Sequence, residues 1–165
     1  MNDAASEVTE ARRRTILASS LTAAQVAAQL NGASEGTATD IDDLRRAGEI
    51  FGVWHKEAAA FVYPRFQFEP QVSAASRRRL LSLLASLGGF VPTDDPGGWR
   101  RAFWLYQRNS RLSPRCCAYD RKPIADPIAA VQYLLPFSDD ARTPAEAFPE
   151  EPNSVFALVN QLGAA

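Results

Sequence analysis

Two adjacent cysteines and one histidine are the residues of this sequence whose chemistry is easiest to recognise. Cys116 and Cys117 are the only cysteines among 165 residues, and His55 is the only histidine. Neighbouring cysteines rarely bridge each other, and a catalytic thiolate needs a base beside it, whereas His55 lies about sixty residues away in sequence. The sequence shows no Gly-rich phosphate loop, no metal-ligand cluster and no paired-carboxylate signature of an enzyme. We therefore expect a protein that is not an enzyme and needs no cofactor or metal, with a cysteine-dependent enzyme as the weakest alternative.

The positive charge is concentrated in the middle of the chain. Residues 71–111 hold seven arginines and two aspartates, residues 112–165 hold four basic and seven acidic residues, and the net charge of the chain is −1. A basic middle beside an acidic end suits one part that meets phosphate and another that meets a different partner. The same pattern also fits a solvated helix face.

The elements that would position these charges begin with two short helices and a hairpin. In LTAAQVAAQLNG, Thr22 and Gln25 have the spacing of a capping box, which predicts a helix from Thr22. TDIDDLRRAG predicts a second helix, capped by Thr39 and ended by Gly48. The β-rich segments EIFGVW and AAFVYP, separated by HKEA, predict a two-stranded hairpin placed as a wing would be.

The second half of the chain predicts more helices. An amphipathic helix is expected from Ser73, with three arginines (Arg77, Arg78 and Arg79) in its first turn. The segment WRRAFWLYQRNSRL predicts an aromatic helix face, and DPIAAVQYLL a helix within the Pro-rich stretch 113–141. TPAEAF predicts one turn capped by Thr143, and the last helix is expected to be capped by Asn153.

The expected fold is mainly α with a small β-hairpin, a helix-turn-helix with wing followed by a helical partner-binding domain. Its predicted parts are a flexible N-terminal segment (1–20), a winged helix-turn-helix-like module (21–70) and a helical domain (71–165) with an inserted loop at 113–142. The N-terminal sequence MNDAASEVTEARRR is charged where a signal peptide is apolar, and no apolar run reaches the roughly 18 to 20 residues that span a bilayer. A cytoplasmic protein without membrane association is expected.

Several of these segments resemble the ParS/MbcA-like (Xre-type) antitoxins of bacterial toxin–antitoxin pairs. The resemblance is by pattern, over residues 21–70 and 80–162, and rests on LTAAQVAAQL, DLRRAGEI, YPRFQFEP, GGW, FWL, NSRL, RTPAEAF and VFALVNQL. It implies a DNA-binding regulator that also neutralises a toxin of the RES fold, an enzyme that consumes NAD. A homo-oligomer is expected, because DNA-binding modules of this size usually act as two-fold dimers.

The resemblance and the charge pattern together give two sets of candidate residues. Contacts with operator DNA are expected from Thr37, Thr39, Arg45, Arg46, Lys56 and Arg65. Contacts with the toxin are expected from Trp104, Leu105, Asn109, Leu112, Thr143, Pro144, Phe148, Val155, Phe156, Val159 and Leu162. For each arginine the alternative is a solvated charge, and for the apolar residues of the last helix it is internal core packing.

The sequence departs from the family in two places. The family has an Asn-x-x-Leu element, matched here by Asn109 and Leu112, and a Thr-Pro dipeptide, matched by Thr143-Pro144. Some thirty residues, 113–142, separate the two here, where the family has only a few. The second helix also carries three aspartates, Asp40, Asp42 and Asp43, and carboxylates are repelled by the phosphates that line a DNA groove. A stand-alone DNA-binding regulator or recombination accessory protein without a toxin is therefore the alternative function.

Overall fold

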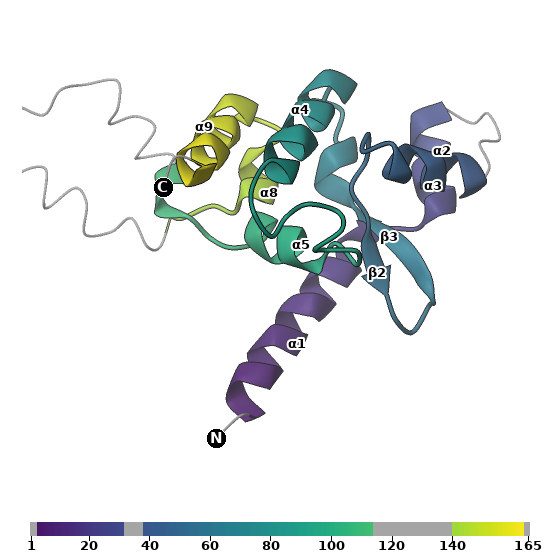
Figure 1. Cartoon of the computed structure of the whole chain (residues 1–165), viewed down its shortest axis with the longest axis horizontal. Helices are drawn as coiled ribbons and strands as arrows, with labels where there is room; N and C mark the ends of the chain where they lie inside the picture. Colours follow the sequence, from purple (N-terminus) through teal and green to yellow (C-terminus); the bar gives the residue numbers. More distant parts are fainter. Residues whose placement is uncertain (1–2, 32–37, 114–139, 164–165) are drawn as a thin grey trace, which may run out of the picture.

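A three-stranded antiparallel sheet with helices packed around it forms the first half of the molecule (Figure 1). The computed structural model describes residues 3–31, 38–113 and 140–163. The order of elements is α1 (Asp3–Ala18), β1 (Ser20–Leu21), α2 (Ala23–Asn31), α3 (Ala38–Arg46), β2 (Val53–His55) and β3 (Ala60–Pro64). The strand order is β1-β3-β2, so β3 is the central strand.

The predicted hairpin is confirmed, and it gains a strand that the sequence analysis missed. β2 pairs with β3 from Val53↔Val62 to His55↔Ala60. β1 pairs with the other edge of β3 through two residue pairs only, Ser20↔Pro64 and Leu21↔Tyr63. A two-residue strand has no alternating pattern of its own, so its position is decided by pairing with β3.

Helices make up most of the second half. After the 3₁₀ turn η1 (Arg65–Phe68) come α4 (Ala74–Ala85), α5 (Trp99–Leu105), a second 3₁₀ turn η2 (Ser110–Leu112), α8 (Pro144–Ala147) and α9 (Pro152–Gly163). The fold of the described residues is thus mainly helical with a small antiparallel sheet, as predicted at that level. Cys116, Cys117, Thr37 and the predicted helix DPIAAVQYLL lie outside the described residues.

The helix caps show where local sequence decides the structure. The predicted capping box forms, with Thr22 N–H donating to Gln25 Oε1 at 2.8 Å. Thr143 caps α8 as predicted and also makes a second capping box, in which its N–H donates to Glu146 Oε2 at 2.8 Å. Two predicted caps are wrong, because α3 begins at Ala38 and α9 at Pro152, which places Thr39 and Asn153 inside their helices. Helix ends of this kind shift by a residue or two when packing, and not the cap, determines the first turn.

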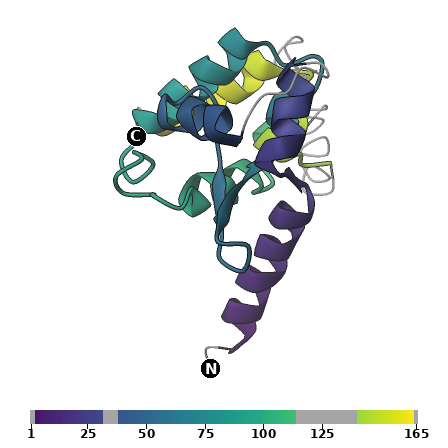
Figure 2. The same cartoon turned by 90° about the vertical axis from the view of Figure 1, so that its right-hand side faces the viewer.

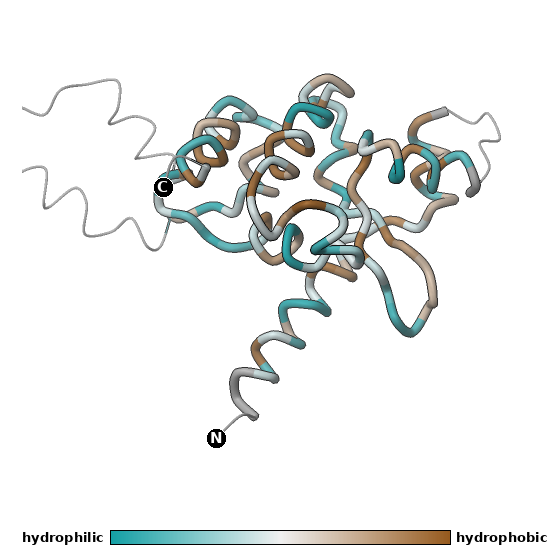
Figure 3. The backbone as a smooth tube through the Cα atoms, viewed as in Figure 1, coloured by the Kyte–Doolittle hydropathy of each residue, from teal (hydrophilic) through white to brown (hydrophobic). Residues whose placement is uncertain are grey.

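The N-terminal segment, expected to be flexible, forms the 16-residue helix α1. It projects from the body of the molecule in both views (Figures 1 and 2) and is hydrophilic along much of that length (Figure 3). Only its last turn reaches the core, where Ile16 is fully buried. The helix is therefore anchored at one end.

The main hydrophobic core joins the two halves of the chain. Its members come from α1, β2 and η1 in the first half and from α4, α5, α8 and α9 in the second. They include Ile16, Val53, Phe66, Leu80, Leu84, Leu105, Phe148, Val155 and Val159. A smaller cluster under α2 and α3 contains Leu21, Val26, Ile41, Ile50 and Tyr63. The predicted modules at 21–70 and 71–165 thus share one core.

The backbone at the start of α5 lies in close contact with the backbone at the start of β2. Gly98, at the N-terminus of α5, has φ +72°, and a Cβ at this position would lie 2.2 Å from the carbonyl oxygen of Gly52. The adjacent Gly97 carbonyl accepts a 2.9 Å hydrogen bond from Trp54 N–H. Only glycine tolerates both the backbone angle and the contact, so this residue sets how closely α5 meets β2.

Candidate binding surfaces

The two candidate DNA-contacting arginines of α3 are engaged within the helix. Arg45 pairs with Asp42 at 2.7 Å, its guanidinium lies 3.8 Å from the centre of the Phe61 ring, and its side chain is only 22% exposed. Arg46 pairs with Asp42 at 2.6 Å and with Asp43 at 3.5 Å, and stays 68% exposed. These contacts orient both guanidinium groups and neutralise much of their charge.

The other candidate DNA contacts are spread over the module. Lys56 is exposed in the turn between β2 and β3, whereas Arg65 is exposed just after the far end of β3. The backbone of Thr39 lies in α3. Arg45 and Arg46 on α3, Lys56 in the β2–β3 turn and Arg65 after β3 therefore come from three separate places in the described part of the chain.

Most of the candidate partner-binding residues belong to the core instead of the surface. Eight of the eleven are buried: Leu105, Leu112, Thr143, Pro144, Phe148, Val155, Phe156 and Val159. Asn109 caps η2 by accepting a 3.0 Å hydrogen bond from Arg111 N–H, which is a structural role. The periodicity identified the apolar faces correctly, but these faces pack against the protein's own helices.

Trp104 and Leu162 are the two remaining candidates, and the structure brings them together. Both line an open groove of about 370 Å³, whose walls are Ser86, Leu87, Gly88, Phe90, Trp104, Leu162 and Gly163. Leu162 is 47% exposed, and Phe90 packs against Trp104 with ring centroids 6.4 Å apart. The groove lies where the C-terminal ends of α4 and α9 meet α5.

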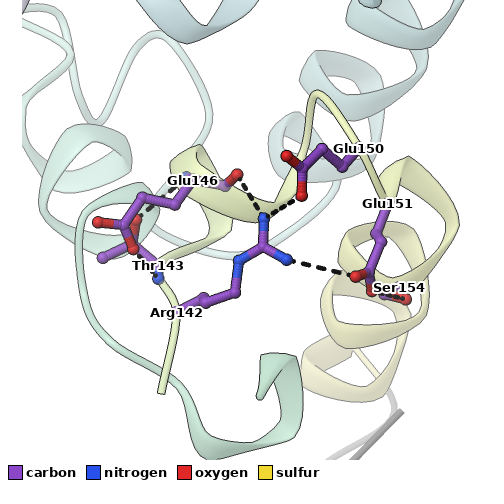
Figure 4. A network of polar contacts seen from close by, with 6 residues as sticks. All are labelled: Arg142, Thr143, Glu146, Glu150, Glu151 and Ser154. Carbon is purple, nitrogen blue, oxygen red and sulfur yellow. Dashed lines mark hydrogen bonds and ion pairs between the residues drawn. The ribbon is translucent and has the colours of Figure 1, made fainter. Parts of the chain in front are cut away.

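A polar network at the N-terminal end of α9 holds α8 against α9 (Figure 4). The Arg142 guanidinium donates to the Glu146 carbonyl and to Glu150 Oε2, both at 2.9 Å, and to Glu151 Oε1 at 3.3 Å. Glu151 also accepts a 3.3 Å hydrogen bond from the Ser154 hydroxyl. The network fixes the turn between the two helices, so Thr143 and its neighbours position the C-terminal half.

Sequence reasoning missed two buried polar residues, Gln67 within the first half and Arg77, which bonds the second half to the first. The Gln67 side-chain amide accepts from Phe51 N–H at 2.8 Å and donates to Phe51 O at 2.6 Å, as a neighbouring strand would. Arg77 donates from Nε to Glu49 O at 2.9 Å and from Nη1 to Gln67 O at 3.1 Å. Burial lowers the pKa of the Arg77 guanidinium. No sequence signal separates these residues from exposed ones, because their partners are backbone atoms.

A second groove, of about 620 Å³, lies between the C-terminal end of α3 and α4. Four arginines line it: Arg45, Arg46, Arg78 and Arg101. Arg101 is paired with the buried carboxylate of Asp95 at 3.0 Å. Since three of the four arginines are in ion pairs, Arg78 contributes most of the uncompensated charge.

Two tyrosines have altered acidity. Burial, with a smaller contribution from Asp42, raises the pKa of Tyr63. Burial also raises the pKa of Tyr106, whose hydroxyl lies 3.2 Å from the Ser19 hydroxyl. Both phenol groups therefore stay protonated to a higher pH than an exposed tyrosine does.

No group of three or more His, Cys, Asp or Glu side chains among the described residues is placed to hold a metal ion. Helices long and apolar enough to cross a membrane are likewise absent from the described ranges. Comparisons with protein families, with curated proteins and with solved structures found no match.

Proposed function

We propose that this protein is a DNA-binding regulator of the antitoxin type, a non-enzymatic protein that binds DNA with its first half and a protein partner with its second. The observation that supports DNA binding is the element order α1-β1-α2-α3-β2-β3 with strand order β1-β3-β2. This order matches the one expected of a winged helix-turn-helix, in which α2 and α3 would be the paired helices and the β2–β3 hairpin the wing.

Partner binding is supported by the groove that contains Trp104 and Leu162. An exposed leucine beside an indole ring is an apolar anchor of the kind that protein interfaces bury, and the groove is small enough for one or two side chains of a partner. By the family resemblance that partner is a RES-fold enzyme that consumes NAD, encoded beside this protein. The location proposed for the complex is the cytoplasm, as a homo-oligomer on its operator.

The partner is tested by co-expressing the tagged protein with its genomic neighbours and assaying recovered proteins for NAD consumption. Leu162→Asp is expected to reduce recovery of the partner at least tenfold, because it places a charge in an apolar contact. Asn160→Asp, an exposed change on the same helix, is the matched control and should leave recovery unchanged. Equal recovery with both variants would exclude the groove, and an NAD-consuming partner that stays active when bound would contradict the antitoxin function.

DNA binding is tested separately with the DNA upstream of the coding sequence as the probe. If the protein binds this DNA and no partner is recovered with it, the stand-alone regulator is the favoured function. The burial of eight of the eleven candidate partner residues is the observation that favours this second function.

A further inference from the structure

We propose that DNA is contacted by the hairpin tip and the adjoining side of α1, and not by the exposed side of α3. The inference rests on the DNA-binding function proposed above and names the surface that carries it. We call this surface the hairpin face and define it by Arg12, Arg13, Trp54, Lys56 and Trp99.

The exposed side of α3 is unsuited to a phosphate-lined groove. Asp40 and Asp43 are exposed on it, and Asp42 is already paired with both arginines of the helix. The three aspartates outnumber the two arginines. A helix placed in the major groove lies between two rows of phosphates, so this excess of carboxylates opposes its entry.

The hairpin face is a continuous surface made by three elements. The Arg13 guanidinium lies 5.3 Å from the centre of the Trp99 ring, and Trp99 Nε1–H donates to the Trp54 carbonyl at 3.1 Å. α1, α5 and β2 are therefore in contact one after the other. α1 and the hairpin also project from the same end of the molecule in two perpendicular views, so one duplex can lie across both (Figures 1 and 2).

The residue types on this surface suit a nucleic acid. Arg12 and Lys56 are exposed, and the side chain of neither makes an ion pair with another described residue. Trp54 is 39% exposed, and its ring packs edge-on against Phe61 with the ring centroids 5.1 Å apart. Cations contact phosphate, and a rigid aromatic side chain packs against sugar or base.

Acidic residues also lie on this side of the molecule, and they provide the sharpest test. Glu10 is paired with Arg13 at 3.4 Å, whereas Glu57, next to Lys56 in the turn, has a side chain that is 93% exposed. If the turn approaches phosphate, Glu57 weakens binding, and replacing it with a cation strengthens it. Replacing an acidic residue of α3 with a cation then has little effect.

The experiment compares charge changes of equal size on the two surfaces of the full chain. Lys56→Glu is matched with Arg46→Glu, and Glu57→Lys with Asp43→Lys, so that net charge changes equally within each pair. Binding is measured by fluorescence anisotropy over a range of salt concentrations. The probes are a labelled duplex of about 30 base pairs from the upstream DNA, long enough for two half-sites, and a mixed-sequence duplex of the same length. Circular dichroism confirms that each variant is folded.

Lys56→Glu is expected to weaken binding about tenfold and to reduce the salt slope by about 1, and Glu57→Lys to strengthen binding several-fold. The α3 variants should change affinity less than about twofold by the same reasoning. If the α3 variants change the affinity more than this, or if the two variants of a pair change it equally, the proposed role of the hairpin face is wrong, although the protein still binds DNA. If the unmodified protein binds neither duplex, the DNA-binding function also fails.

Discussion

Arg77, Arg78 and Arg79 follow one another in sequence but lie in three different environments. Arg77 is buried and bonded to two backbone carbonyls, Arg78 is exposed at the edge of the α3–α4 groove, and the Arg79 guanidinium lies 4.5 Å from the centre of the Phe156 ring. The sequence indicated one basic run at a helix start. The difference arises from the 100° turn per residue of the helix, which aims only the first arginine at the sheet side.

Replacing Arg77 with Ala should therefore be far more damaging than replacing its neighbour. Arg77→Ala removes two charge-assisted hydrogen bonds and leaves the Glu49 and Gln67 carbonyls without them, a loss of about 3 kcal/mol in the free energy of unfolding. Arg78→Ala, the matched control, should stay within about 0.5 kcal/mol of the parent. Urea unfolding curves measure both, and similar losses would contradict the structural role of Arg77.

The buried tyrosines predict a loss of stability in alkali. Their pKa values are raised in the folded state, so the unfolded state loses its protons first. Stability is therefore complete below the ordinary tyrosine pKa of about 10 and falls as pH rises above it. Tyr106→Phe removes one of these ionisations and should reduce the loss of stability between neutral and alkaline pH. At neutral pH it should lower the free energy of unfolding by about 1 kcal/mol, because the contact with Ser19 is lost.

The check is the urea midpoint of both proteins at about pH 8 and pH 10.5, on either side of the tyrosine pKa. If the urea midpoint falls by the same amount in both proteins, Tyr106 does not contribute to the loss of stability in alkali. Tyr63→Phe provides a second, independent comparison.

At the scale of elements, the caps at Thr22 and Thr143 were predicted correctly, those at Thr39 and Asn153 were wrong, and the short β1 pairing was missed. The Thr22–Gln25 capping box is local, so its spacing in the sequence was enough. β1 is held by two residue pairs with a strand more than forty positions away, a distance over which no periodicity operates. The same limit explains why the contact between Gly98 and Gly52 was not predicted.

Replacing Gly98, where α5 meets the hairpin, and Gly48, just after α3, distinguishes the cost of a close contact from the cost of backbone strain. Gly48 has φ +73°, and a Cβ added there would have no other atom within 4 Å, so Gly48→Ala should cost only about 1 kcal/mol. Gly98 has nearly the same φ, but a methyl group there overlaps the Gly52 carbonyl oxygen. Gly98→Ala should cost about 2 kcal/mol more than Gly48→Ala in thermal or urea unfolding.

At the scale of the whole molecule, the shared core predicts one unfolding transition. Phe51, Val53 and Phe66 from the first half pack with Leu80, Phe148 and others from the second. Tryptophan fluorescence and far-ultraviolet circular dichroism should therefore give the same urea midpoint, and the fragment 71–165 should not unfold cooperatively by itself. Two separate transitions would instead show independent domains.

The sequence also could not distinguish a core from an interface at this scale. The spacing of Val155, Phe156 and Val159 identified the apolar side of α9, but an apolar side is the same whether a partner or α4 covers it. Only the exposed position of Leu162, one turn further along, sets that residue apart. The surface available to a partner is accordingly much smaller than the predicted set of residues.

The contact between Asn109 and Arg142 has a consequence for how this protein can vary. Asn109 N–H donates to the Arg142 carbonyl at 3.0 Å as an isolated bridge, and Ala141 and Leu112 on either side are buried. The bridge thus holds together the segment that leads into η2 and the segment that precedes α8. The closure entropy of a chain segment rises by only about 0.6 kcal/mol for each doubling of its length. A change in the number of residues between these two fixed ends should therefore cost the described helices little stability.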